Sequence, residues 1–195
     1  SEDGGVMFFD GGNYFDIPAF AKSFSAGELY VVIKQPNGSS NTSFHTWGNH
    51  SNSHFFWGTT PLSIYENFGR SNRLSFNYSP DSLDDYFIYN VSSGVNGLFV
   101  NINAELMKSD TGGSVGWGES NTLGKGDWTG HDWSDGYIQE VLFFNKVLDT
   151  DEQSKVNHYL SAKWGLTTEV DSDGDGVVDA SDFAPLDPNV QVDLT

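Results

Sequence analysis

Short apolar runs of strand length, separated by clusters of turn-forming residues, make up most of this sequence. Residues 28–35 (ELYVVIKQ) are one such run, and the turn cluster PNGSSN follows them directly. In residues 73–78, Leu74, Phe76 and Tyr78 alternate with polar residues, as they do in a strand that is buried on one face. About ten such segments follow one another, so the sequence predicts an all-β fold of two packed antiparallel sheets.

Two segments in the second half of the chain are predicted to be single strands. These are residues 98–109 (LFVNINAELMKS) and residues 114–120 (SVGWGES). Hydrophobic residues make up 37% of the chain and aromatic residues 15%, which is enough for one large core. We expect Trp117 in that core. The other aromatic residues expected to pack there, on one or both sides, are Phe8, Phe9, Phe55, Phe56, Phe143 and Phe144.

Residues 148–166 (LDTDEQSKVNHYLSAKWGL) differ from the rest, because their apolar residues recur with a helical period. The apolar stripe consists of Val156, Tyr159, Leu160 and Trp164. Asp149 can cap the first turn, and Glu152, three residues later, completes a capping box. Gly165 suits the position after the last turn, where a left-handed conformation is common. The sequence therefore predicts one C-terminal helix over 150–164 that packs against the sandwich.

The most specific chemical signal is DSDGDGVVDASD, at residues 171–182. Counted from Asp171, acidic residues occupy positions 1, 3, 5, 9 and 12 and Gly176 occupies position 6, which is the spacing of an EF-hand-like calcium loop. Ca²⁺ prefers about six to eight oxygen ligands, and alternate residues can supply several of them from one short loop. The predicted metal ligands are Asp171, Asp173, Asp175, Val177, Asp179 and Asp182. No predicted helix leads directly into this loop, so a helix–loop–helix EF-hand is not expected.

A second acidic segment, GKGDWTGHDWSDGY at residues 124–137, has two interpretations. In the first, the loop folds back, its aspartates form turns and Trp133 covers one open end of the sandwich. In the second, the carboxylates of Asp127, Asp132 and Asp135 converge on a Ca²⁺ ion. The ligand-binding residues around that ion would be Trp128, His131 and Trp133, with Asn49 and His50 from the polar loop at 47–54. An open coordination position on the ion could accept a ligand carboxylate or a vicinal sugar diol, so this reasoning leaves peptide and sugar open.

Composition and motifs argue against several classes of function. The net charge of −18 argues against nucleic acid and anionic membranes as partners, since both need Lys and Arg. There is no cysteine, which excludes disulfides and thiolate metal sites, and no apolar run has the length of a membrane span. His45, His50 and His54 lack the spacing of a zinc motif and are expected to be polar loop residues. Glu140 has no second carboxylate at the spacing that glycoside hydrolysis on a strand would need, so no catalytic activity is expected.

Both ends of the predicted sandwich resemble a known family. Residues 135–166 contain an Ile-x-Glu-Val strand, an Asn-x-x-Leu turn and a capped helix that ends in Lys-Trp-Gly-Leu. This segment resembles the closing part of concanavalin A-like (laminin G-type) jelly-roll domains, and residues 5–20 resemble their first hairpin. Residues 171–189 are similar to a thrombospondin type 3 calcium repeat. The resemblance implies a two-sheet antiparallel jelly-roll sandwich with one C-terminal helix in residues 1–166, and a calcium-binding tail in residues 167–195.

A cysteine-free, acidic jelly roll that precedes a calcium motif resembles the ligand-binding module of a large bacterial RTX-type adhesin, and its peptide-binding domain in particular. This resemblance implies an extracellular, monomeric module within a longer chain, with Ca²⁺ as its cofactor. The module would recognise peptide C-termini or surface proteins through a bound Ca²⁺ ion. A calcium-dependent, lectin-like module that binds surface glycans and a passive structural spacer are the alternatives.

Overall fold

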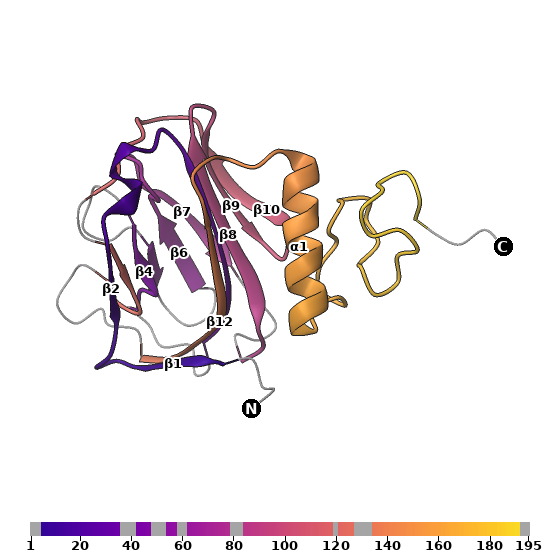
Figure 1. Ribbon diagram of the computed structural model, residues 1–195, viewed down its shortest axis with the longest axis horizontal. Helices are drawn as coiled ribbons and strands as arrows, with labels where there is room; N and C mark the ends of the chain where they lie inside the picture. Colours follow the sequence, from indigo (N-terminus) through magenta and orange to yellow (C-terminus); the bar gives the residue numbers. More distant parts are fainter. Residues whose placement is uncertain are drawn as a thin grey trace.

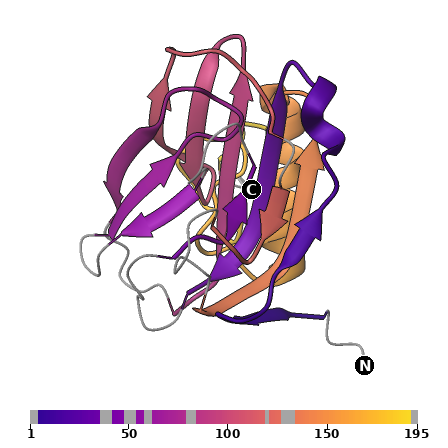
Figure 2. The ribbon, with the colours of Figure 1, turned by 90° about the vertical axis from the view of Figure 1, so that its left-hand side faces the viewer.

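The computed structural model describes residues 5–35, 42–47, 54–57, 62–78, 84–118, 121–126 and 134–191. Within these residues there are twelve β-strands, a short 3₁₀-helix (Phe20–Ser23) and one α-helix, α1 (Thr150–Trp164). The strands form two facing layers, and α1 lies on the outer side of one of them (Figures 1 and 2). The predicted antiparallel β-sandwich with one C-terminal helix is therefore confirmed. No helix in the described part of the chain is long and apolar enough to cross a lipid bilayer.

One layer is a six-stranded antiparallel sheet in the order β1-β12-β3-β8-β9-β10. Its strands are β1 (Met7–Asp10), β12 (Ser134–Phe144), β3 (Gly27–Lys34), β8 (Phe87–Gly94), β9 (Gly97–Ile102) and β10 (Glu105–Asp110). The sheet joins the first strand of the chain to the last, because β1 pairs with β12.

The facing layer consists of two three-stranded sheets, in the orders β2-β11-β4 and β5-β6-β7. Their strands are β2 (Phe15–Ile17), β4 (His45–Thr46), β5 (His54–Trp57), β6 (Leu62–Glu66), β7 (Leu74–Tyr78) and β11 (Asn121–Leu123).

The central strands β3 and β8 of the six-stranded sheet are buried on both faces, and the alternation along β3 separates two cores. Leu29, Val31 and Ile33 point into the main core between the two layers, where Phe44, Phe56 and Ile64 lie opposite them. The intervening residues Tyr30 and Val32 point the other way and pack with residues of α1 and the tail. A strand that is buried on both faces loses the polar alternation of a half-exposed strand, which explains the continuous apolar run in the sequence.

The helix forms as the sequence predicts. The carboxylate of Asp149 accepts the backbone N–H of Glu152, and the Glu152 side chain accepts the backbone N–H of Asp149, so the capping box is present. Gly165 adopts a left-handed conformation with φ of 74°, and the N–H of Leu166 folds back to the carbonyl of Ser161 at 2.8 Å.

The core assignments also hold for the aromatic side chains that the structure describes. Phe9, Phe56 and Trp117 are buried, while Phe143 and Phe144 pack partly buried against the two cores. Phe8 is half exposed on the outer face of β1, where its ring lies 4.8 Å from that of Tyr137. The side chain of Phe55 lies outside the described residues.

Two of the predicted strands are corrected by the structure. Residues 98–109 are not one strand but most of a hairpin, because Asn103 and Ala104 both adopt positive φ and reverse the chain between β9 and β10. In the described part of 114–120, Val115 makes only an isolated bridge to Arg70. The third strand of this region, β11, begins at Asn121 and was not predicted. The hairpin turn contains no Gly or Pro, so the sequence gives little sign of it. A strand of three residues, such as β11, is too short to show a clear alternation.

Candidate metal centre

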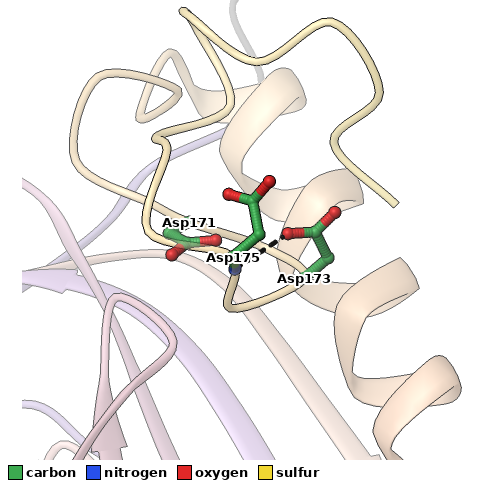
Figure 3. Close-up of side chains that lie close together, drawn as sticks. All are labelled: Asp171, Asp173 and Asp175. Atoms are coloured by element: carbon green, nitrogen blue, oxygen red, sulfur yellow. Dashed lines mark hydrogen bonds between the residues drawn. The ribbon is translucent and has the colours of Figure 1, made fainter. Parts of the chain in front are cut away.

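The carboxylates of Asp171, Asp173 and Asp175 lie together in the tail that follows α1 (Figure 3). Each offers an oxygen atom, and these oxygens lie within 4.8 Å of one another. All three side chains are partly buried. The structure thus brings together the first three residues of the predicted calcium loop.

Short-range hydrogen bonds orient this loop. The two carboxylate oxygens of Asp171 accept the N–H groups of Gly174 and Gly176, each at 2.8 Å. Asp173 accepts the N–H of Asp175 at 3.2 Å, the contact drawn in Figure 3, and Asp175 accepts that of Val177 at 2.8 Å. Gly174 and Gly176 have φ of 80° and 96°, a conformation that side chains disfavour, so glycine allows the chain to wrap around its own carboxylates.

The remaining oxygens of the loop have the chemistry of a cation site. One oxygen each of Asp173, Asp175 and Asp182 is buried and has no hydrogen-bond partner among the described residues. Burial raises the pKa of the Asp173 carboxyl, and the neighbouring charges of Asp175, Asp182 and Asp171 raise it further. A hard divalent cation can coordinate buried carboxylate oxygens that lack hydrogen-bond donors, and it neutralises their mutual repulsion. Ca²⁺ binds such oxygens in flexible geometry. The donor set therefore fits Ca²⁺.

Asp179, the residue at position 9 of the predicted calcium loop, contacts α1 instead of this cluster. Its carboxylate accepts the Ser172 N–H at 2.9 Å, the Ser172 hydroxyl at 2.8 Å and the Ser161 hydroxyl at 2.5 Å. Nδ1 of His158 lies 3.3 Å from the same carboxylate. These contacts occupy both oxygens and attach the tail to the helix. A ligand role for Asp179, and one for the carbonyl of Val177, stay predictions.

Apolar packing adds to this attachment. Val170 is fully buried in the outer core with Leu160 and Leu166. Backbone bonds from Asp179 to Val170 and from Ala180 to Thr167, both at 2.8 Å, close the tail into a compact turn beside the helix. The predicted calcium loop is thus held against α1 (Figure 1). The division into 1–166 and 167–195 stays a prediction.

The second predicted calcium site lies mostly outside the described residues. This applies to Asp127, Trp128, His131, Asp132 and Trp133, and to Asn49 and His50 of the other polar loop. The backbone of Asp135 belongs to β12, and its side chain is not described. The assignments of these residues stay predictions.

The described start of that loop is tightly fixed. Gly124 has φ of 86°, and a Cβ atom there would lie 2.1 Å from the Phe9 ring. Its N–H donates to the carbonyl of Phe44 at 2.6 Å. The carbonyl of Lys125 accepts the hydroxyls of Thr122, at 2.8 Å, and Thr46, at 3.1 Å. The chain therefore enters residues 127–133 from a rigid position at the edge of the main core.

Sequence reasoning placed His45 and His54 on polar loops, which is wrong. Both are fully buried in strands, with ring centroids 5.1 Å apart. Nε2 of His45 lies 3.3 Å from the Glu66 carboxylate, which also accepts the Tyr89 hydroxyl at 2.9 Å. Burial holds the pKa of His54 well below its usual range, so this ring is neutral. The alternation of His54 with Phe56, a core residue two positions later, is the signal that could have placed His54 inside.

No protein-family model matches the sequence, and no curated protein sequence matches it either. Solved structures do match. Domain 4 of AbnA, an extracellular GH43 arabinanase from Geobacillus stearothermophilus, in complex with arabinotriose, matches with a TM-score of 0.55 at 12% identity, over 76% of this chain and 74% of that one. The Ruminococcus gnavus IT-sialidase CBM40 bound to α2,3-sialyllactose matches with 0.53 at 13% identity, over 78% and 97%.

The binding domain of botulinum neurotoxin DC, in complex with SialylT, has a TM-score of 0.51 at 12% identity and is matched over 80% of this chain. This chain spans only 46% of that structure. At such identities the comparison establishes the fold, which is a concanavalin A-like, laminin G-like jelly roll. The fold that the sequence resemblance implied is thereby confirmed. A shared fold does not fix the ligand, which depends on the residues of the site.

Proposed function

We propose that this chain is a calcium-braced, glycan-binding module of a cell-surface protein. The observation that carries the proposal is the likeness of its jelly roll, over about three-quarters of the chain, to modules solved with arabinotriose and sialyllactose. A saccharide is better supported by these comparisons than the peptide C-terminus that the sequence resemblance favours. The placement in an extracellular adhesin belongs to the same proposal, and it is supported by the similar module of the arabinanase, which is an extracellular enzyme.

Binding without turnover is supported by the role of Glu140, the strand carboxylate considered above for catalysis. Its two oxygens accept the Tyr159 hydroxyl at 2.9 Å and the Trp164 indole N–H at 2.6 Å, and Lys163 lies at 3.0 Å. All three partners belong to α1. Glu140 therefore ties the helix to the sheet, and its carboxylate is occupied by structural contacts.

Calcium enters the proposal in two places. Asp171, Asp173 and Asp175 would bind an ion that stiffens the tail. Asp127, Asp132 and Asp135 would bind a second ion with an open coordination position. A vicinal diol of a sugar could replace water there, with Trp128, His131, Trp133, Asn49 and His50 around it.

The test is an array of neutral and sialylated oligosaccharides, probed with the labelled chain in calcium and again in chelator, beside an array of peptides with free C-termini. We expect glycan signals of which at least some disappear with the chelator. Asp127→Ala and Asp132→Ala should each abolish these calcium-dependent signals, whereas the Asp173→Ala/Asp175→Ala pair should leave them intact. Signals only on peptides, or none on either array, would contradict the glycan proposal, and an array on which every glycan signal persists in chelator would contradict the calcium step.

A further inference from the structure

A groove of about 620 Å³ lies on the outer face of the six-stranded sheet, beside the first turn of α1. Its lining includes Phe99 and Asn101 of β9, Leu106 of β10 and Gln153 of α1. Figure 1 shows α1 alongside these strands, on the side of the sheet away from the main core. None of the groove's described lining residues belongs to the calcium loop or to residues 124–137. The groove is therefore distinct from both proposed calcium sites.

A buried carboxylate is hydrogen-bonded to two lining residues of the groove, Leu148 and Gln153. Glu28 of β3 is fully buried, and one of its oxygens accepts both Asn90 Nδ2 and Gln153 Nε2, each at 3.0 Å. The other oxygen accepts the N–H of Leu148 at 2.7 Å. Asn101 Nδ2 in turn donates to Asn90 Oδ1 at 2.7 Å. Burial raises the pKa of Glu28, and these hydrogen bonds oppose the rise by favouring the ionised form.

This network decides which way the amide groups face. Asn90 and Gln153 both turn their NH₂ groups toward the same carboxylate oxygen of Glu28, which accepts from each. Asn90 then offers its oxygen to Asn101, which must also turn its NH₂ group inward. Oδ1 of Asn101 and Oε1 of Gln153 face away from the network, and among the described residues neither accepts a hydrogen bond. Two acceptors on lining residues of the groove are thus held in fixed orientations.

The rest of the lining is apolar or uncharged, with one exception. Val95, Leu106 and Val147 are 94%, 55% and 38% exposed, and the half-buried Phe99 adds an aromatic surface. The exception is Asp149, whose carboxylate caps α1. A chain with a net charge of −18 repels anions, and two outward acceptors favour a ligand that donates hydrogen bonds. Hydroxyl donors combined with apolar C–H faces and no charge are the properties of a neutral saccharide.

We infer that the groove between α1 and β8–β10 is a binding site for a neutral oligosaccharide, with Asn101 and Gln153 accepting its hydroxyls. Phe99 and Leu106 pack against its apolar face. The inference rests on the proposed glycan-binding function and adds a site that is separate from the loop at 124–137. Because this site contains no calcium ligand, its binding does not depend on calcium.

The test uses the full chain on the same oligosaccharide array, followed by titration of the strongest neutral hit in calcium and in chelator. Leu106→Arg fills the groove with a charged side chain at an exposed position, so the fold is expected to tolerate it. Leu186→Arg is its matched control, since Leu186 is 46% exposed in the tail and the charge change is the same. Asn101→Leu removes one acceptor at nearly constant volume, together with the donor to Asn90 Oδ1, so a modest fall in Tm is expected for this variant. An unchanged Tm for Leu106→Arg and Leu186→Arg, and an unchanged β-type circular dichroism spectrum for Asn101→Leu, verify that the fold is intact.

We expect Leu106→Arg to weaken neutral-glycan binding at least about tenfold and Asn101→Leu several-fold, with Leu186→Arg within about twofold of the parent chain. Binding that persists in chelator but is lost in Leu106→Arg supports the groove. Glycan binding that is lost in Asp132→Ala and unchanged in Leu106→Arg overturns the groove and leaves the proposed function standing. Binding only to sialylated glycans, or a peptide signal that Leu106→Arg removes, also overturns it. An array without any glycan signal refutes the proposed function and this inference with it.

Discussion

Asp179→Ala should release the tail from α1 while leaving the sandwich folded. The Asp179 side chain is 1% exposed, and its carboxylate accepts one backbone N–H and the hydroxyls of Ser161 and Ser172. Hydrogen bonds to a charged group contribute about 1.5–3 kcal/mol each, although contributions within one network are not additive. His158 is partly exposed, so its contact with the carboxylate contributes less. We therefore expect a loss of about 3 kcal/mol in the free energy that keeps the tail docked.

Native-state hydrogen exchange measures this loss directly. The backbone N–H groups of residues 179 and 180 donate to Val170 and Thr167, and they exchange only when the tail opens. A loss of about 3 kcal/mol corresponds to roughly 100-fold faster exchange at these two positions. Amides in the centre of β3, such as that of Val31, should keep their protection, because the main core is untouched.

The matched control is Asp187→Ala, which removes the same charge from the same tail. Asp187 is exposed, and among the described residues its carboxylate bonds only to Asn189, two residues away. It should leave exchange at residues 179 and 180 unchanged. Equal exchange in the two variants would refute the argument that the Asp179 carboxylate attaches the tail. Accelerated exchange throughout β3 in Asp179→Ala would refute the separation of tail from sandwich.

Three further outcomes follow from single sites. Replacing Asp173 and Asp175 together by Asn should weaken calcium binding by roughly 100-fold or more, because two charged ligands are lost. Calorimetric titration measures this affinity. An unchanged affinity would contradict the assignment of the loop as a calcium site. Burial alone would raise the pKa of Glu140, but hydrogen bonds from α1 lower it below its usual 4.5 on balance. The ionised Glu140 therefore stabilises the fold above pH 4.5, and this stabilisation is lost as the pH falls through the lowered pKa. The Tm difference between the parent chain and Glu140→Gln should shrink on acidification. A Tm difference that grows on acidification would refute the lowered pKa. Gly124→Ala should destabilise the sandwich by about 3 kcal/mol in urea unfolding, because a Cβ there meets a core aromatic ring at positive φ, whereas Gly5→Ala, with open space around it, should have no effect.

Features encoded within a few neighbouring residues could be predicted from the sequence. The capping box of α1 needs only Asp149 and Glu152, three positions apart. The loop at Asp171, Asp173 and Asp175 gathers its carboxylates through hydrogen bonds that span at most five residues. Strand periodicity is local in the same way. These features depend on local conformation and not on the tertiary arrangement, so the spacing of residues in the sequence is enough to predict them.

Contacts between distant segments could not be predicted in this way. The spacing of the acidic loop predicts a calcium ligand at Asp179, but it does not predict the contact of this carboxylate with Ser161, eighteen residues earlier, which comes from docking of the tail. His45 and His54 are polar by type, and only the closure of the two layers buries them beside Glu66 and Tyr89.

The sequence by itself determined the β-sandwich class, the single C-terminal helix and the acidic loop, because each depends on short-range periodicity or spacing. The tertiary structure alone decided where the tail attaches and that a groove exists beside α1. Gln153, which lines that groove, is hydrogen-bonded to Glu28, 125 residues earlier in the chain. No local sequence pattern predicts such a contact, because it forms only when the helix packs on the sheet and brings hydrogen-bond donors to the buried carboxylate.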